Sequence, residues 1–324
     1  MAPPTTLRPK ALRPGDVVVV AALSGGLDAD DGAVLRRGVA ELEALGFEVL
    51  VSPLVDPDRG WWWSAARPAE IADELNRLLR DPAVRAIFAL TGGRTVFGYL
   101  DRIDYDAVRA DPKPIVGFSD IDVLHLALYG RTGLSCVHGD LVTAGLGDWG
   151  ANEARRKELA DVYAAVLTGA SPVGPLPQGR PWEGWRPGRA EGVLVGGLLN
   201  RLVRIQGTPY ALDLARFDGA ILFWEEFMTN HAGVWTDLQA LRLAGVLDRI
   251  AGMVVGVPTE VEPTEGGPET LREVALDVLG DQDIPVLGNA EIGHQPPNVP
   301  LPLGVRAELD ADAATLSLLE PATA

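Results

Sequence analysis

The 324-residue sequence has a single cysteine, Cys136, and only four histidines. One cysteine cannot form an intrachain disulfide, and it argues against a cysteine-rich metal site. There is no His-x-x-x-His pair, no cysteine pair and no P-loop motif, and the glycine turn at Leu23–Gly26 lacks the spacing of a dinucleotide-binding loop. We therefore expect neither a metal ion nor a cofactor.

Basic residues and long apolar runs are also scarce. The chain has 28 Lys and Arg against 45 Asp and Glu, which gives a net charge of -17. That charge would be repelled by a nucleic acid polymer or an anionic membrane. No apolar run approaches the ~20 residues that span a bilayer, and Met1–Lys10 lack the apolar core of a signal peptide. We expect a cytoplasmic protein with neither of these partners.

The residues that are present describe an ordinary globular chain, with 47% hydrophobic and 23% charged residues. In the first half, apolar segments at Val17–Ala22, Phe47–Val51 and Ala86–Leu90 alternate with helical patterns. This order is typical of a parallel sheet covered by helices, with ligand sites at the carboxyl ends of the strands. The Gly92–Gly93 pair and Ser119 both follow such strands.

A segment rich in proline and glycine, Ser171–Pro181, separates this half from the next. Beyond it, further strand patterns occur, and Gly304–Leu319 alternates like two antiparallel strands. We predict an α/β fold of two domains: a Rossmann-like N-terminal domain at 1–167 and a smaller, mixed, β-rich C-terminal domain at 191–324. Residues 168–190 would link them.

Ser119 stands between an apolar strand that ends at Gly117 and a helical pattern that begins at Ile121. A serine on such a tight turn has its hydroxyl raised from the sheet, as in a nucleophile elbow. Only half of the G-x-S-x-G pattern is present, because Ile121 replaces the second glycine. Ser119 is therefore either a nucleophile or a helix-capping serine.

A serine nucleophile needs a base, and position leaves the choice of histidine open. His294 and His138 each lie in a loop or turn that follows a predicted strand, where catalytic histidines are often presented. His125 is six residues beyond Ser119, on a different face of the same helix. The base would be His294, His138 or no histidine at all.

The base in turn needs an orienting acid. The apolar run Ala220–Trp224 ends abruptly in Glu225 and Glu226. A carboxylate at the end of a strand could accept the Nδ1–H of a histidine and stabilise the imidazolium. The alternative is that both are solvated acids at the start of a loop.

Seven ordered segments carry a family resemblance. They are Lys10–Asp16, Gly92–Gly93, Asp111–Asp120, Arg131–Leu134, Ala190–Gly192 with Gly196–Gly197, Leu222–Glu226, and Gly293–His294 with Pro300–Gly304. Together they resemble the LD-carboxypeptidase family of serine peptidases, which includes the microcin-immunity hydrolases. The similarity is spread over nearly the whole chain, and ordered matches of this kind are more specific than any single motif.

The resemblance implies a catalytic triad of Ser119, Glu225 and His294, with the nucleophile in the first domain and its partners in the second. The active site would then lie at the domain junction. The backbone N–H groups of Gly93 and Asp120 would form the oxyanion hole.

The implied activity is that of a serine-type carboxypeptidase or amidase, which cleaves a C-terminal amide through an acyl-enzyme. Members act on amides of peptidyl or aminoacyl nucleotides, as microcin-immunity hydrolases do, or on the L-to-D bond of murein tetrapeptides, and homodimers are common. We favour the first substrate. The alternatives are the murein LD-carboxypeptidase, an amidase or esterase for a secondary metabolite, and a non-catalytic ligand-binding relative.

The substrate-binding residues that we predict are Gly92, Arg94, Trp182 and Trp185. Arg94 follows the glycine pair and could meet a carboxylate or phosphate, or it could extend to solvent from a helix start. Trp182 and Trp185 are similar to the tryptophan loop of immunity members, where a ring can stack on a nucleobase-like group. They could equally form a hydrophobic clasp.

Three consecutive tryptophans, Trp61–Trp63, follow Asp58-Arg59-Gly60. Three adjacent large rings cannot all face one core. At least one of them is expected to line a pocket or an interface.

Overall fold

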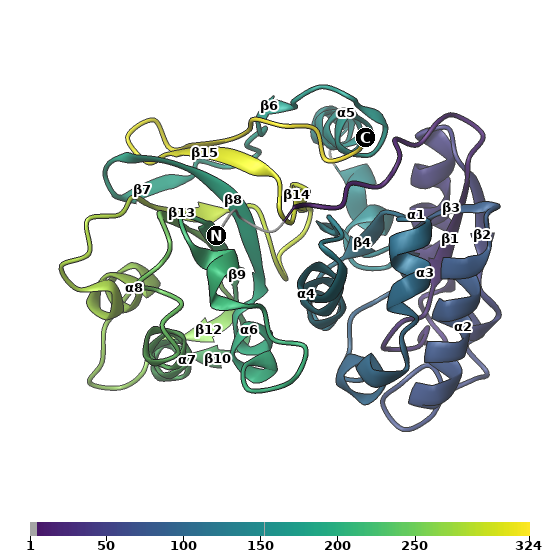
Figure 1. Ribbon diagram of the computed structural model, residues 1–324, viewed down its shortest axis with the longest axis horizontal. Coiled ribbons are helices and arrows are strands. Elements are labelled where there is room, and N and C mark those ends of the chain that lie inside the picture. The colour runs from purple at the N-terminus through teal and green to yellow at the C-terminus, as the bar shows by residue number, and fades with distance from the viewer. Residues whose placement is uncertain (1–4, 152) are drawn as a thin grey trace.

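A computed structural model describes residues 5–151 and 153–324. The chain forms two halves, each built on its own sheet, with the first half in purple and blue and the second in green and yellow (Figure 1). The first half has the predicted parallel sheet, and the second half has a mixed sheet. The predicted two-domain α/β fold class is confirmed.

Six strands form the first sheet, of which five are parallel and one, β14, is antiparallel. Buried apolar residues fill β1, β3 and β4, as expected of strands covered on both faces, whereas the edge strand β2 is largely exposed. In spatial order the strands are β14 (Leu301–Pro302), β5 (Val137–His138), β4 (Ile115–Gly117), β3 (Val84–Ala89), β1 (Val17–Ala21) and β2 (Glu48–Val51).

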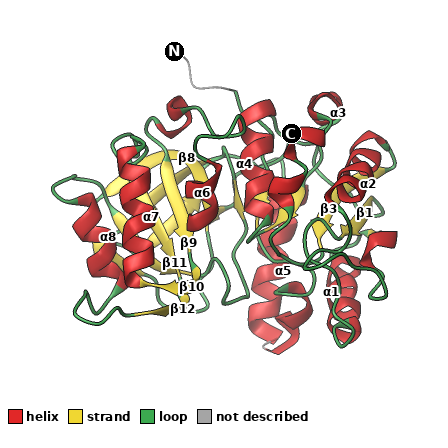
Figure 2. Cartoon of the chain, turned by 90° about the horizontal axis from the view of Figure 1, so that it is seen from below, coloured by secondary structure: helices red, strands yellow, loops and turns green. Residues whose placement is uncertain are grey.

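Five helices cover this sheet, with α1 and α5 on one side and α2, α3 and α4 on the other (Figure 2). Helix α2 shows the amphipathic pattern that its sequence predicts, with Ile71, Leu75 and Leu78 buried. The helices are α1 (Gly32–Ala44), α2 (Pro68–Arg80), α3 (Tyr105–Ala110), α4 (Ile121–Thr132) and α5 (Glu153–Thr168). The sequence also predicts a helix over about 151–167, and residue 152 of that segment lies outside the described residues.

The second sheet has eight strands, with a parallel centre and antiparallel edges. In spatial order they are β6 (Gly174–Pro175), β16 (Thr315–Leu318), β15 (Arg306–Asp310), β8 (Arg189–Leu198), β9 (Ile221–Glu225), β11 (Gly252–Gly256), β13 (Val286–Ala290) and β7 (Glu183–Arg186). Two short strands, β10 (Phe227–Asn230) and β12 (Thr259–Glu262), pair separately.

Helices α6 (Leu199–Ile205), α7 (His231–Leu243) and α8 (Leu271–Leu279) lie together along one side of this half (Figure 1). Five 3-10 helices occur in the connections among the described residues. They are η1 (Pro53–Val55), η2 (Val96–Gly98), η3 (Leu100–Arg102), η4 (Leu146–Ala151) and η5 (Leu214–Phe217).

Helix α4 lies between the two halves and contacts α6 and β8 of the second half (Figure 1). Its residues Ile121–Tyr129 are all buried, polar ones included. The sequence predicts a helix with Ile121, Leu124 and Leu128 on one buried face, but the structure buries every face, because the helix packs against the first sheet and the second half at once. A helix that is buried all round has no solvent face to reveal in its sequence.

The segment expected as a linker contains β6 and β7, and β14 returns from the second half to the edge of the first sheet. The domain boundaries, the homodimer and the cytoplasmic location stay predictions. Within residues 5–151 and 153–324, no helix is both long enough and apolar enough to cross a membrane.

The return of β14 predicts that the two halves depend on each other for stability. Leu301 is fully buried in β14, so Leu301→Ala should lower the free energy of unfolding by about 2–5 kcal/mol. Leu243→Ala, which truncates a leucine that is 79% exposed at the end of α7, should change it by less than about 0.5 kcal/mol. Urea unfolding measures both, and equal effects of the two substitutions would contradict the argument.

Candidate active site

Ser119 occupies the sharp turn between β4 and α4, as its sequence context predicts. Its φ is 67°, in the left-handed region that non-glycine residues seldom adopt. Close packing holds the turn, since a Cβ on Gly117 would lie 2.9 Å from the Cβ of Ala89. Backbone strain of this kind costs on the order of 1–3 kcal/mol and is concentrated at functional sites.

Ser119, His294 and Glu225 form a continuous chain of hydrogen bonds. Ser119 Oγ lies 3.0 Å from His294 Nε2, and His294 Nδ1 lies 2.8 Å from Glu225 Oε2. Glu225 is the last residue of β9, and His294 lies in the loop after β13, so both lie at the carboxyl ends of parallel strands that are separated by β11 alone. The arrangement can carry a proton from the hydroxyl to the imidazole, with the carboxylate to orient the ring.

Packing fixes the imidazole and the carboxylate in place. The ring of Phe227 stacks on His294 with centroids 4.2 Å apart and planes 2° apart, and Phe118 meets the imidazole edge-on at 5.0 Å. Glu225 is completely buried. Gly293, at φ 107°, lies against this carboxylate, and a Cβ there would be 2.5 Å from Oε2.

The Gly92–Gly93 pair lies directly beside Ser119. A Cβ on Gly92 would be 2.9 Å from Ser119 Oγ, and one on Gly93 would be 2.4 Å from Ser24 Oγ. Gly93 also has a φ of 148°. Both positions therefore require glycine, because a side chain would displace either the serine or the loop behind it.

Asp120, at the start of α4, is a buried anchor for this loop. Its Oδ2 accepts hydrogen bonds from Ser24 Oγ at 2.7 Å, from the backbone N–H of Thr95 at 2.7 Å and from that of Val96 at 3.0 Å. Its Oδ1 accepts from Arg201 Nε at 3.0 Å. The carboxylate thus fixes the residue after Ser119 to the segment that contains Gly93.

Arg201, on α6 of the second half, extends this network across the junction. Besides Asp120, its guanidinium donates to the carbonyl of Gly93 at 3.2 Å and to Asn200 Oδ1 at 2.7 Å. Asn200 donates from its backbone N–H and its Nδ2 to Glu226, at 3.0 and 2.6 Å. Neither Arg201 nor Asn200 was predicted from the sequence as a site residue. An arginine in the apolar run of α6 was the available signal, because a buried arginine requires partners.

A cavity of about 350 Å³ opens at this site. Its lining includes Ser119 and His294, the glycines at 25, 26, 92 and 93, and the ring of Trp63. The cavity therefore meets the nucleophile, the imidazole and the glycine loop together, where a reacting carbonyl could bind.

The remaining predicted binding residues lie elsewhere. Arg94 is exposed and does not line the cavity, whereas Trp182 and Trp185 are buried in the second half. The indole of Trp185 packs on Gly288 of β13. A ligand that stacked on either indole would need this segment to move, and both contacts stay predictions.

The other histidine considered as a base, His138, pairs with a different carboxylate. Its Nδ1 lies 2.9 Å from Asp122 Oδ1, and Asp122 Oδ2 accepts the backbone N–H of Leu198 at 2.8 Å. Burial lowers the pKa of His138, but the charge and hydrogen bond of Asp122 outweigh it, so the pKa is raised. This buried pair ties α4 to the end of β8.

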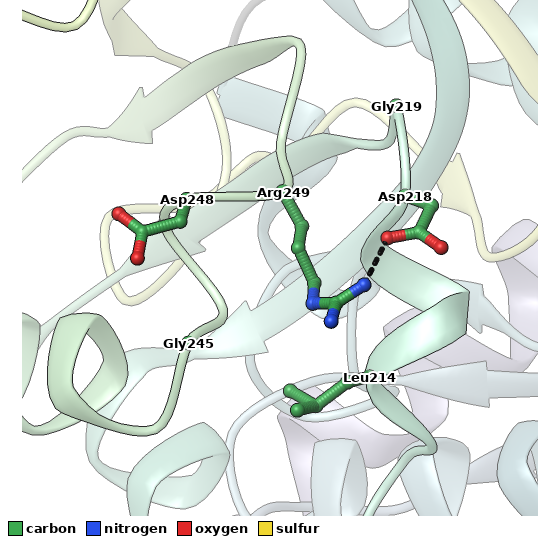
Figure 3. A pocket seen from close by; sticks show the side chains of 6 residues that line it. All are labelled: Leu214, Asp218, Gly219, Gly245, Asp248 and Arg249. Carbon is green, nitrogen blue, oxygen red and sulfur yellow. Dashed lines mark hydrogen bonds and ion pairs between the residues drawn. The ribbon is translucent and has the colours of Figure 1, made fainter.

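A second cavity, of about 540 Å³, lies on the surface of the second half (Figure 3). There the guanidinium of Arg249 turns toward Asp218 at 2.5 Å, while the carboxylate of Asp248 points away. Its lining residues include no serine or histidine, so it offers no nucleophile with a base. In the described part of the chain, no three His, Cys, Asp or Glu side chains converge to hold a metal ion.

Glu226 gives the site a pH-dependent stability. Burial raises the pKa of Glu226 to about 7, and the charge of Glu225 adds to this effect to a lesser degree. The hydrogen bonds that Phe227 and Asn200 donate to the carboxylate lower the pKa, but they do not outweigh burial. The folded chain then binds a proton over a pH range in which the unfolded chain has lost it. The stabilisation that comes from this proton uptake has its full value below pH 4.5, the ordinary pKa of the group, and it is lost as the pH rises through 7.

We predict that the unfolding free energy of the wild type, relative to Glu226→Gln, falls by about 1–3 kcal/mol between pH 4.5 and 8. Urea unfolding of both proteins across this range measures the difference. A difference that does not change with pH would contradict the raised pKa.

Family models match both halves of the chain. The LD-carboxypeptidase N-terminal domain matches residues 18–139, and the LD-carboxypeptidase C-terminal domain matches residues 191–309. A Streptomyces coelicolor protein, named only provisionally as a carboxypeptidase, is 34% identical, with 98% of this chain and 97% of that protein covered.

Two further relatives carry more specific names. The microcin C7 self-immunity protein MccF of Escherichia coli is 28% identical over 88% of this chain and 87% of its own length. The murein tetrapeptide carboxypeptidase of Pseudomonas aeruginosa is 25% identical over 86% of this chain and 89% of its own length.

Solved structures agree with these sequence matches. MccF in complex with glutamyl sulfamoyl guanosine superposes with a TM-score of 0.89 at 25% identity, over 98% of this chain and all of that one. The muramoyltetrapeptide carboxypeptidase of Oxalobacter formigenes superposes with a TM-score of 0.76 at 25% identity, over 93% of this chain and 97% of that one. The resemblance seen in the sequence is thus confirmed, and the chain belongs to the LD-carboxypeptidase family of serine peptidases.

Proposed function

We propose that this chain is a serine hydrolase that cleaves a C-terminal amide through an acyl-enzyme, with Ser119, His294 and Glu225 as its triad. The observation that carries the proposal is the hydrogen-bond chain from Ser119 Oγ to His294 and on to the buried Glu225. Such a chain supports turnover over the alternative of a non-catalytic ligand-binding relative, because binding alone requires no aligned nucleophile and base.

In the first step, Ser119 Oγ attacks the amide carbonyl carbon while His294 Nε2 takes the hydroxyl proton. Glu225 accepts the Nδ1–H and stabilises the imidazolium. The tetrahedral intermediate collapses as His294 returns the proton to the leaving amine, which departs and leaves an acyl ester on Ser119. Water, deprotonated by His294, then attacks the ester and releases the carboxylate and free Ser119.

The oxyanion of the tetrahedral intermediate would be stabilised by the backbone N–H groups of Gly93 and Asp120. Preorganised donors of this kind are typically worth on the order of 3 kcal/mol each. The side chain of Asp120 and the carbonyl of Gly93 are both held by Arg201, which therefore acts as a positioning residue for the two peptides.

The substrate class that we favour is the amide of an aminoacyl or peptidyl nucleotide. Support comes from the likeness to MccF, whose solved complexes contain glutamyl sulfamoyl guanosine and aspartyl sulfamoyl adenosine. The second candidate is a murein tetrapeptide, which the names of the Pseudomonas aeruginosa and Oxalobacter formigenes relatives favour.

Product analysis tests the nucleophile and the substrate together. Wild type, Ser119→Ala and Ser171→Ala would each receive a murein tetrapeptide and aspartyl sulfamoyl adenosine in one tube, with products followed by mass spectrometry. We expect wild type to cleave the sulfamoyl adenosine amide and Ser119→Ala to lose at least about 10³-fold in rate.

Ser171 is exposed and remote from the triad in sequence, and its alanine variant should retain full activity. Cleavage of the tetrapeptide alone would select the second candidate. Equal rates for wild type and Ser119→Ala would disprove the proposed mechanism.

The positioning role of Arg201 predicts a loss in kcat with little change in KM. Arg201→Met removes all three of its hydrogen bonds, so kcat should fall roughly 10–100-fold, and Arg201→Lys should recover part of that loss. The control is Arg204→Met, which alters an exposed arginine on the same helix. A purely structural arginine would instead lower the unfolding temperature while kcat per folded molecule stayed constant.

A further inference from the structure

The tight turn of Trp61, Trp62 and Trp63 presents an unusual amount of aromatic surface to solvent. Trp62 is 75% exposed and Trp63 is 61% exposed. The rings of Trp61 and Trp62 stack with centroids 3.9 Å apart, and that of Trp63 follows at 5.4 Å. Exposed apolar surface of this extent usually marks a binding site.

The turn adjoins the catalytic cavity. Trp63 lines the same cavity as Ser119 and His294. Just beyond it, Ser64 Oγ and the backbone N–H of Ala65 both donate to the carbonyl of Ser24, each at 3.0 Å. Because the hydroxyl of Ser24 is itself bonded to Asp120, the turn is anchored to the loop beside the nucleophile.

The backbone of the turn is strained at Trp62. Two hydrogen bonds between Trp61 and Ser64, of 2.8 and 3.0 Å, close it, and Trp62 has a φ of 54°. The first central position of such a closed turn normally takes glycine when φ is positive. A bulky tryptophan there costs stability, and strain of this kind is most often retained for function.

Among the aromatic residues that line the cavity, Trp63 is the one whose ring is largely exposed to solvent. The two other aromatic rings of the lining, Phe118 and Phe227, already pack against His294. Four glycines are among the other lining residues, and no lysine or arginine is among the described ones. Recognition of a substrate group here would therefore depend on ring stacking more than on a cationic side chain.

We propose that Trp63, supported by the stacked rings of Trp62 and Trp61, is a specificity-determining surface that binds a planar aromatic group of the substrate. The inference rests on the proposed hydrolase function and narrows it, because it selects amides that carry a nucleobase or similar ring. A murein tetrapeptide has no aromatic ring to place there.

Binding without turnover tests this directly. In a Ser119→Ala background, isothermal titration would measure Kd for aspartyl sulfamoyl adenosine and for a murein tetrapeptide. Adding Trp63→Ala should raise the Kd for aspartyl sulfamoyl adenosine on the order of tenfold or more and leave the Kd for the murein tetrapeptide unchanged. Adding Trp63→Phe should recover most of the affinity, since a smaller ring still stacks.

The matched control is Trp235→Ala on α7, which removes another partly exposed tryptophan, one that donates to Asp277 and does not line the cavity. It should change neither Kd. The proposal is overturned if the parent variant does not bind the sulfamoyl adenosine, if Trp63→Ala leaves its Kd unchanged, or if both ligands weaken equally. Such a failure leaves the Ser119 product analysis untouched, because that experiment measures turnover with Trp63 intact.

Discussion

The burial of α4 between the two halves is the constraint on which the site depends. Ser119 precedes this helix in the first half, whereas Glu225 and His294 belong to the second. A hydrogen bond of 3.0 Å between Ser119 and His294 survives only if the halves keep a fixed relation. The apolar residues of α4, buried on every side, supply that rigidity, since packed interiors resist small displacements.

Polar contacts then set the register of the junction. Asp120 and Asp122, two positions apart in sequence, each bind the second half: the first through Arg201 and the second through the backbone N–H of Leu198. Buried charges are costly unless each has a partner, so such a pair tolerates only one arrangement of the two halves. Arg201, which forms an ion pair with Asp120 across the junction, also donates a hydrogen bond to the carbonyl of Gly93.

The sequence was sufficient for features that are local or that lie at strand ends. Ser119, Glu225 and His294 each lie at or just after the end of an apolar strand, where site residues are expected. Position alone left the base and the acid open, because Ser119 belongs to the first sheet and the other two to the second. Only the family resemblance implied that the three form a triad. The sequence was insufficient for contacts made across the junction. Arg201 lies on a short helix that was not predicted, and although the apolar residues around it are a signal of burial, they do not identify Asp120 as its partner. The return of β14 to the first sheet is a long-range pairing with equally little local signal.

We propose that His294 and Glu225 activate Ser119 across the junction of the two halves. The most direct test is the rate at which a fluorophosphonate modifies Ser119, followed by intact-protein mass, in wild type, Glu225→Gln and His294→Ala. We predict a single adduct on Ser119 of the wild type, formed much more slowly in both variants although they remain folded. No adduct on the wild type, or equal rates in all three proteins, would contradict the account.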